Sequence, residues 1–315
     1  MINLVLGGCG FVGTNLVEKI LASGEEVISV DNLSNGVLKN SLTSHRNYTF
    51  LNLDISTRAG FENLRESLKK LNEDVKIWHL AANSDISQGS QNLFVDYEDT
   101  LGTTISALAL VDELNVKDFI FASSSAVYGE RLDIPMSENM EIIYPASAYG
   151  IAKLASEMTI FNKLKNYPTK VRIYRFPNVI GLPMTHGVFS DFYKKLKRKP
   201  DILNVLGDGN QLKPFLHVGD LIDSMLNLNN SKEKYEIFNI GPNDKGLEIH
   251  KIAELMVQEF SPKTKIKYGS SPFGWEGDIP KYSFDLTKAI KNGLNPELSS
   301  EKSVRKLIEE LHLNG

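Results

Sequence analysis

Residues 1–13 read MINLVLGGCGFVG, and this stretch decides the fold. The short apolar run from Ile2 to Leu6 predicts a buried strand. Three glycines at a spacing of three follow it: Gly7, Gly10 and Gly13. Apolar residues then recur at helical spacing, and a second strand-like run, Glu26 to Val30, ends at Asp31. A strand, a glycine turn, a helix and a strand together indicate a nucleotide-binding βαβ unit.

Each glycine has its own role in such a unit. Gly7 permits the tight turn, Gly10 lets the backbone approach a pyrophosphate, and Gly13 lets helix and strand pack closely. The N-terminus of the helix then faces the phosphates, where free N–H groups favour negative charge. Asp31, eighteen residues past Gly13, can accept hydrogen bonds from ribose hydroxyls, and its carboxylate would repel a 2′-phosphate. We therefore expect NAD rather than NADP as the cofactor.

A second informative stretch lies between residues 119 and 153. The run from Phe119 to Ala122 predicts a buried strand, and a helix is expected to follow, with Pro145 near its first turn. Tyr149 and Lys153 are four residues apart, so on a helix they share one face. A lysine there favours the phenolate of the tyrosine, whose ordinary pKa is about 10. The pair predicts a tyrosine that moves a proton, although the same spacing also occurs by chance.

Composition narrows the class of protein. The chain has 315 residues, enough for one large or two modest domains, and is 42% hydrophobic and 23% charged. A net charge of −4 offers no basic surface for nucleic acid. Cys9 is the only cysteine, which fits a reducing compartment. With no signal-peptide pattern and no apolar run of membrane-spanning length, we expect a soluble, cytoplasmic protein without a membrane partner.

The glycine spacing, with Tyr149-x-x-x-Lys153 downstream, resembles the extended short-chain dehydrogenase/reductase family. The nearest branch is the NAD-dependent nucleotide-sugar epimerases and dehydratases, because residues 31–36 match the adenosine-side loop of UDP-glucose 4-epimerase-like enzymes. The resemblance covers nearly the whole chain. It implies an α/β fold: a Rossmann doubly wound parallel sheet in residues 1–180, with later strands returning to it, and a smaller substrate-binding α/β domain mainly in 181–315. The active site would lie in the cleft between them.

The resemblance also assigns roles to individual residues. Catalysis is implied for Ser124, Tyr149 and Lys153. Contacts with NAD are implied for Gly7, Gly10, Phe11, Val12, Asp31, Asn32, Ser34, Asn35, Asp54, Ile55, Leu80, Ala81, Ala82, Tyr149, Lys153 and Phe176. Contacts with the substrate are implied for Ser84, Ser124, Ser125, Asn178, His186, Lys213 and Trp275. Asn178 could instead cap a turn, and His186 could serve only to start a helix. No metal site is expected.

The loop after Ala122 separates the reactions of the family. Dehydratases that act at C4 and C6 carry Thr-Asp-Glu where this chain has Ser124-Ser125-Ala126. Decarboxylating relatives place Glu at the Ala126 position, and the epimerase-reductases that make GDP-fucose place Cys there. Ala126 has no group to ionise, so these three chemistries are disfavoured. The expected reaction is oxidation at C4 of a nucleotide-diphosphate sugar through a 4-keto species, in the biosynthesis of surface polysaccharide sugars.

Four departures from the family pattern leave the substrate open. Asp99 stands where the family usually has Asn, Lys213 replaces an arginine that pairs with the diphosphate, and Pro214 replaces an acid. A second arginine expected near Trp275 is also missing. The substrate could be a UDP-hexose or a larger sugar such as GDP-heptose, as for a GDP-heptose 4-dehydrogenase of capsule assembly. Either a 4-epimerase or a 4-dehydrogenase fits the residues.

Two further expectations complete the sequence reading. A catalytically silent NAD-binding sensor or scaffold of the same fold is the rival to an enzyme. The intact set of Ser124, Tyr149 and Lys153 disfavours that rival. A homodimer built on helices near residues 92–114 and 146–166 is implied by the family.

Overall fold

The computed structural model describes residues 1–83, 89, 91–130, 134–141, 143–184, 187–199, 201–274, 279–295 and 297–314. The chain forms two compact units. Unit 1 comprises Met1–Val127, Tyr144–Arg175 and Asn229–Phe238. Unit 2 comprises Tyr128–Ile143, Phe176–Leu228 and Asn239–Gly315. The chain therefore crosses from one unit to the other several times.

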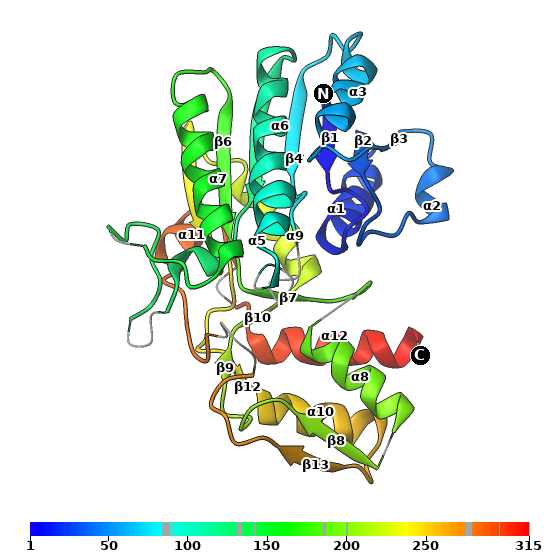
Figure 1. Cartoon of the computed structure of the whole chain (residues 1–315), viewed down its shortest axis with the longest axis vertical. Coiled ribbons are helices and arrows are strands. Elements are labelled where there is room, and N and C mark those ends of the chain that lie inside the picture. Colours follow the sequence, from blue (N-terminus) through cyan, green and yellow to red (C-terminus); the bar gives the residue numbers. More distant parts are fainter. Residues whose placement is uncertain are drawn as a thin grey trace. The chain divides into compact units, whose positions relative to one another are not determined.

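Unit 1 is built on a seven-stranded sheet in the order β11-β6-β5-β4-β1-β2-β3. The strands are β1 (Ile2–Leu6), β2 (Glu26–Asp31), β3 (Tyr48–Asn52), β4 (Val75–His79), β5 (Val116–Ala122), β6 (Lys170–Arg175) and β11 (Tyr235–Asn239). The pairs from β3 to β6 are parallel, and β1 lies between β4 and β2 (Figure 1). Apart from β11, this is the strand order of a doubly wound nucleotide-binding sheet, and the predicted fold class is confirmed.

The register of the central strands places their carboxyl ends next to one another. Leu6 at the end of β1 lies opposite Val30 of β2 and His79 of β4. Each central strand buries apolar residues because both faces of a parallel sheet are covered; Leu4, Ile77 and Phe119, for example, are fully buried in one core cluster. The carboxyl ends of the strands therefore form one edge, where ligands of such sheets bind.

The helices of unit 1 alternate with the strands of its sheet. They are α1 (Phe11–Ala22), α2 (Asn40–Thr43), α3 (Arg58–Leu68), α5 (Leu93–Asp96), η1 (Tyr97–Gly102), α6 (Thr103–Ala109), η2 (Leu110–Asp112) and α7 (Ala148–Leu164). The long helix expected over 92–114 is a run of shorter pieces in which η1 is a π-helical turn. Helix α7 begins three residues after Pro145, because Ser147 is its N-cap and accepts a hydrogen bond from the Gly150 N–H at 3.1 Å.

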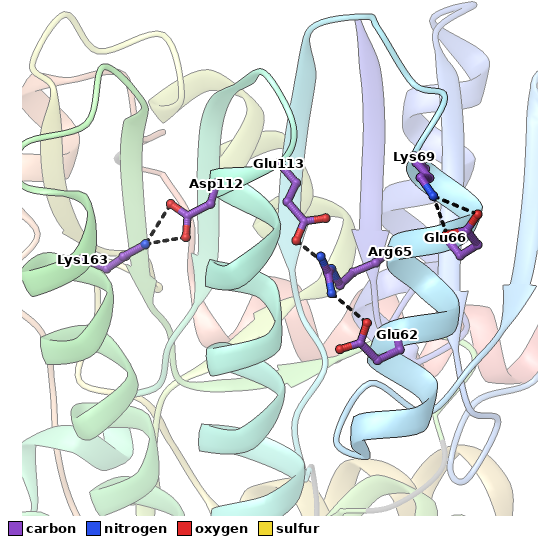
Figure 2. Close-up of polar contacts among 7 residues, drawn as sticks. All are labelled: Glu62, Arg65, Glu66, Lys69, Asp112, Glu113 and Lys163. Carbon is purple, nitrogen blue, oxygen red and sulfur yellow. Dashed lines mark hydrogen bonds and ion pairs between the residues drawn. The ribbon is translucent and has the colours of Figure 1, made fainter.

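Figure 2 shows α3, α6 and α7 side by side along one face of the sheet. Ion pairs lie on their outer surfaces: Arg65 contacts Glu62 of the same helix at 2.7 Å and Glu113 at 2.6 Å, and Lys163 of α7 binds both oxygens of Asp112. These side chains are substantially exposed, so each pair contributes little, on the order of 0–1 kcal/mol. The helices are held mainly by the apolar core beneath them.

Unit 2 has a separate core formed by three small sheets and several helices. Its strands are β7 (Asn178–Ile180), β8 (Ile202–Val205), β9 (Leu212–Lys213), β10 (Phe215–His217), β12 (Leu247–Glu248) and β13 (Lys265–Tyr268), paired as β7 with β10, β8 with β13 and β9 with β12. Its helices are α8 (Val188–Arg198), α9 (Val218–Leu228), α10 (Ile249–Phe260), α11 (Thr287–Lys291) and α12 (Ser300–Asn314), and a 3-10 turn, η3 (Ser125–Tyr128), joins the units.

Within the described part of the chain, none of the helices combines the length and the apolar character needed to cross a membrane.

Candidate functional site

The glycine loop between β1 and α1 has the shape that the sequence predicts. Gly7 has φ +84°, which favours glycine, and a Cβ there would lie 2.7 Å from the Ala81 nitrogen. A Cβ on Gly13 would lie 2.0 Å from the Gly7 carbonyl oxygen, so the loop and the helix approach too closely for a side chain. A Cβ on Gly10 would meet the same oxygen at an ordinary 3.4 Å, so space is left beside Gly10.

This loop fits the diphosphate of NAD. Gly10 is the N-cap of α1, no side chain among the described residues caps that helix, and its first turn holds no acid. Phe11 and Val12, the first two helical residues, are partly buried. The free N–H groups of the first turn and the helix dipole favour an anion at this place.

Asp31 links the glycine loop to the end of β2. Its Oδ2 accepts a hydrogen bond from the Cys9 N–H at 2.9 Å, and its Oδ1 accepts one from the Leu33 N–H at 2.8 Å. The second bond holds Leu33 at φ +59°, an unusual conformation for a residue other than glycine. Asp31 thus shapes the loop, and its oxygens keep lone pairs for a ribose hydroxyl.

The other residues expected near the adenosine lie on the neighbouring loops. Asn32 Oδ1 accepts from the Ser34 N–H at 3.0 Å, and the side chains of Asn32, Ser34 and Asn35 are exposed. Asp54 Oδ1 accepts from the N–H and hydroxyl of Ser56. Burial acts to raise the pKa of Asp54, but these bonds and one to Asn32 outweigh it and lower the pKa. Ile55 is buried, and its carbonyl accepts from the Ser106 hydroxyl at 2.7 Å.

The end of β4 lies beside the glycine loop. The Leu80 N–H donates to the Leu6 carbonyl at 2.9 Å, and the Ala81 carbonyl accepts from the Thr103 hydroxyl at 3.1 Å. Leu80, Ala81 and Ala82 are partly buried at this edge. Ser84 lies outside the described residues. His79, the last residue of β4, is fully buried with Nε2 2.8 Å from the Thr104 hydroxyl, and therefore belongs to the scaffold.

Helix α7 places Tyr149 and Lys153 at the carboxyl end of β5. Lys153 is 2% exposed, and its Nζ donates to the Ala122 carbonyl at 2.7 Å. The same nitrogen lies 5.7 Å from the centroid of the partly buried Tyr149 ring. The Ser124 side chain hydrogen bonds with Tyr149, and Ser125 follows it at the start of η3. The structure thus brings together the three residues expected in catalysis.

The expectation that Lys153 lowers the pKa of Tyr149 is wrong for the chain by itself. Burial, the largest cause, raises the pKa of Tyr149 to about 12; the bond with Ser124 opposes the rise and the charge of Asp96 adds to it. Burial also lowers the pKa of Lys153 to about 7, against the charges of Glu157 and Asp96. Burial removes water from the charged form of each group. For both pKa values, this effect is larger than the attraction that their closeness would give an ammonium and a phenolate.

A buried ion pair below Lys153 was missed in the sequence. Glu157 Oε2 accepts from Arg175 Nη2 at 2.5 Å, and its Oε1 accepts from Arg175 Nε at 3.0 Å and from the Ser123 hydroxyl. Both side chains are almost fully buried. The pair ties α7 to the ends of β5 and β6, so it sets the height of Tyr149 and Lys153 above the sheet. The four-residue spacing between Lys153 and Glu157 is the sequence feature that could have indicated a role for Glu157.

The remaining expected residues belong to unit 2. Asn178 begins β7, and its Nδ2 donates to the Tyr282 hydroxyl at 3.1 Å and to the Pro214 carbonyl at 3.4 Å. Lys213 is partly buried in β9, which pairs with β12, and Phe176 is partly buried after β6. His186 and Trp275 lie outside the described residues. Among those residues, no group of three or more His, Cys, Asp or Glu side chains could hold a metal ion.

Comparison with known proteins gives the same assignment over the whole chain. The model of the NAD dependent epimerase/dehydratase family matches residues 3–241. A putative UDP-glucose 4-epimerase of Methanocaldococcus jannaschii is 30% identical over 99% of each chain, and a UDP-glucuronate 4-epimerase of Thermodesulfobacterium geofontis is 27% identical over 97% of this chain and 94% of its own. The structure of the UDP-glucose 4-epimerase of Thermotoga maritima with UDP-glucose is 29% identical, with a TM-score of 0.86 over 100% of this chain and 99% of its own.

The family of these matched proteins agrees with the kinds of residue that lie at the carboxyl edge of the sheet. They confirm the predicted family, the enzyme class and NAD as the cofactor. The glycine cradle before α1 fits that cofactor, and Ser124, Tyr149 and Lys153 lie together at the edge of the same sheet. The chain belongs to the NAD-dependent epimerase/dehydratase family.

Proposed function

We propose that this enzyme oxidises C4 of a nucleoside-diphosphate sugar to a 4-keto sugar. The phenolate form of Tyr149, which the Lys153 ammonium stabilises, takes the proton of the C4 hydroxyl and becomes the neutral phenol, while Ser124 hydrogen bonds the same substrate oxygen. When bound, NAD would supply the acceptor for the C4 hydrogen, which leaves as hydride. The observation that carries the proposal is the meeting of Ser124, Tyr149 and Lys153 at the end of β5.

Oxygens that can accept hydrogen bonds and free backbone N–H groups lie along the edge of the sheet in unit 1. They support the placement of NAD there. The diphosphate binds at Gly7, Gly10, Phe11 and Val12, where the start of α1 is uncapped. The adenosine side binds on the loops after β2 and β3, and the nicotinamide ribose binds beside the end of β4 and Lys153. Substrate contacts are proposed for Ser124, Ser125, Asn178 and Lys213.

The 4-keto sugar has two fates. If the sugar rotates and takes the hydride back on its other face, the enzyme is a 4-epimerase. If the ketone is released, it is a 4-dehydrogenase and the reduced cofactor must be reoxidised. The named relatives are epimerases of UDP sugars, which supports the first fate and a UDP-hexose. Lys213, a point charge at a position where the family has a forked arginine, supports a different or larger substrate such as GDP-heptose.

The substrate can be identified from the melting temperature. UDP and GDP are added separately to the purified enzyme, and the nucleotide that binds the folded state raises the melting temperature by mass action. Sugars of that nucleotide are then incubated with and without added NAD. A stereoisomer as the sole product without added NAD identifies the epimerase, and a 4-keto product that forms together with NADH only when NAD is added identifies the dehydrogenase.

Tyr149→Phe tests the chemistry. It removes the hydroxyl but keeps the ring beside Lys153, so NAD binding is retained and turnover falls by at least about 100-fold, the usual size of a lost general base. Turnover equal to that of the parent would refute the mechanism. A chain that binds NAD but turns over no nucleotide sugar would be a sensor or scaffold.

We further propose that the enzyme is a homodimer through one helical face of unit 1. Large apolar side chains are exposed on α5 and α6 (Phe94 71%, Ile105 56%) and on α7 (Met158 66%, Phe161 49%). Such side chains clustered on adjacent helices are typical of an interface with a second copy. Met158→Asp should convert a dimer to a monomer in light scattering; a monomeric parent would refute the proposal.

The proposed place of the reaction is the cytoplasm, where nucleotide sugars for surface polysaccharides are made and where a lone cysteine such as Cys9 stays reduced.

A further inference from the structure

The first turn of α7 carries a glycine directly after Tyr149. Gly150 is the third residue of this helix, is buried, and donates its N–H to the Ser147 hydroxyl oxygen at 3.1 Å. Glycine is unfavourable within a helix because it loses more conformational freedom on folding than other residues. Gly150 does not have a positive φ that would call for it. The reason for a glycine at this position therefore lies in what packs against it.

The space beside Gly150 is filled by the backbone of η3. A Cβ on Gly150 would lie 2.4 Å from the Ala126 carbonyl oxygen, 3.0 Å from the Ala126 carbonyl carbon and 3.0 Å from the Pro145 Cβ. Two of these three atoms belong to the main chain, so no side-chain rotation can make room. Since ordinary contacts of a Cβ begin at 3.4 Å, Gly150→Ala would push η3 away from α7 by about 1 Å.

The turn η3 follows the residue whose hydroxyl meets Tyr149. The Ala126 N–H donates to the Ser124 hydroxyl oxygen at 3.1 Å, and the Val127 N–H donates to the Ser124 carbonyl at 3.3 Å. The first bond uses the Ser124 hydroxyl as an acceptor, so its proton is free to be donated. The Ser124 side chain hydrogen bonds with Tyr149. Ala126 thus contacts both sides of the site: its N–H holds Ser124, and its carbonyl lies against the residue after Tyr149.

We propose that Gly150 is a positioning residue of the reaction, because its missing side chain lets η3 lie against α7 and thereby sets the distance between the Ser124 hydroxyl and the Tyr149 phenol. This distance matters because both groups are to contact one substrate oxygen. A misplacement of about 1 Å can cost on the order of 100-fold in rate. The catalytic meaning of the contact rests on the proposed function, but the contact itself needs neither NAD nor a sugar.

The contact is tested without any ligand, by NMR of protein that carries 13Cζ-labelled tyrosine. The Tyr149 resonance is assigned by its loss in Tyr149→Phe. Ser124→Ala removes the hydroxyl that binds the phenol and should shift this resonance. Gly150→Ala should shift it in the same direction, and the double variant should shift it no further than Ser124→Ala does. The matched control, Gly102→Ala, places a Cβ 3.5 Å from its nearest neighbour and should leave the resonance unchanged.

Turnover of a nucleotide sugar then separates positioning from a general packing defect. Gly150→Ala should lower kcat by about 10- to 100-fold in the parent. In the Ser124→Ala background it should lower kcat by less than about 3-fold, because the effects of residues that act through one another are not additive. A packing defect would lower kcat equally in both backgrounds.

An unchanged Tyr149 resonance or an unchanged kcat in Gly150→Ala overturns the proposal, as do equal losses of kcat in the two backgrounds. If Gly150→Ala does not fold, Ser124→Ala decides: the Tyr149 resonance should shift, and the Ala126 amide should exchange its hydrogen faster because its acceptor is lost. If either stays unchanged, η3 does not couple the two residues and the proposal is refuted. A parent that turns over no nucleotide sugar would refute the proposed function and leave the NMR result standing.

Discussion

Glu157→Gln should destabilise unit 1 much more than an ordinary loss of an ion pair. In the parent, Glu157 and Arg175 are 4% and 3% exposed and share two contacts, at 2.5 Å and 3.0 Å. Glutamine keeps one acceptor oxygen, but its NH2 group opposes the Arg175 donors, and the carboxylate charge that balances the buried guanidinium in this pair is lost. Losing one partner of a buried pair costs about 3–5 kcal/mol.

The assay is urea unfolding followed by circular dichroism, with Glu66→Gln as the matched control. Glu66 pairs with Lys69 at 3.2 Å on the surface of α3, where both side chains are mostly exposed (Figure 2), so the control should change the free energy of unfolding by less than about 0.5 kcal/mol. Replacing both members, as Glu157→Leu with Arg175→Met, should recover much of the loss, because no unpaired charge remains. A cost below about 1 kcal/mol for Glu157→Gln would show that the pair does not hold α7 on the sheet.

Three further predictions concern single residues. Gly13→Ala should abolish the rise in melting temperature caused by NAD, because its Cβ would lie 2.0 Å from the Gly7 oxygen, whereas Gly102→Ala, with 3.5 Å to its nearest neighbour, should keep it. Ser147→Ala should lower the free energy of unfolding by about 1 kcal/mol by removing the cap of α7. The pKa of His79 is about 3 when folded and 6.5 in its ordinary state, so the unfolded chain binds one more proton between these values and stability falls as pH drops through that window. His79→Gln should therefore reduce the pH slope of the unfolding free energy by up to about 1.4 kcal/mol per pH unit in urea titrations.

Local patterns were sufficient for the scaffold of the site. The glycine spacing predicts the turn at Gly7 because only a residue without Cβ accepts that φ and that contact with Ala81. The helix period predicts that Tyr149 and Lys153 face the same way, and their ring-to-nitrogen distance of 5.7 Å agrees. The boundary of α7 was less accurate, since Ser147, not Pro145, provides the first-turn bond.

The charge states of the site residues could not be predicted from these local sequence patterns. The pKa of Tyr149 moves opposite to the prediction because desolvation depends on everything packed around the ring. The sequence offers no sign that Asp96, which lies 57 positions from Lys153, is fully buried or shares its environment. In the structure α5, which ends at Asp96, packs against α7, which carries Lys153.

The βαβ unit and the family could be predicted from residue types and from their spacing within one or two neighbouring elements. The environment that sets the charge of the site residues, and the contacts that hold them in place, could be found only in the tertiary structure. Burial and Coulomb energies depend on distances through space, and the groups that set them here, Asp96, Glu157 and Arg175, come from separate elements that meet only when the sheet and its helices have closed around Lys153.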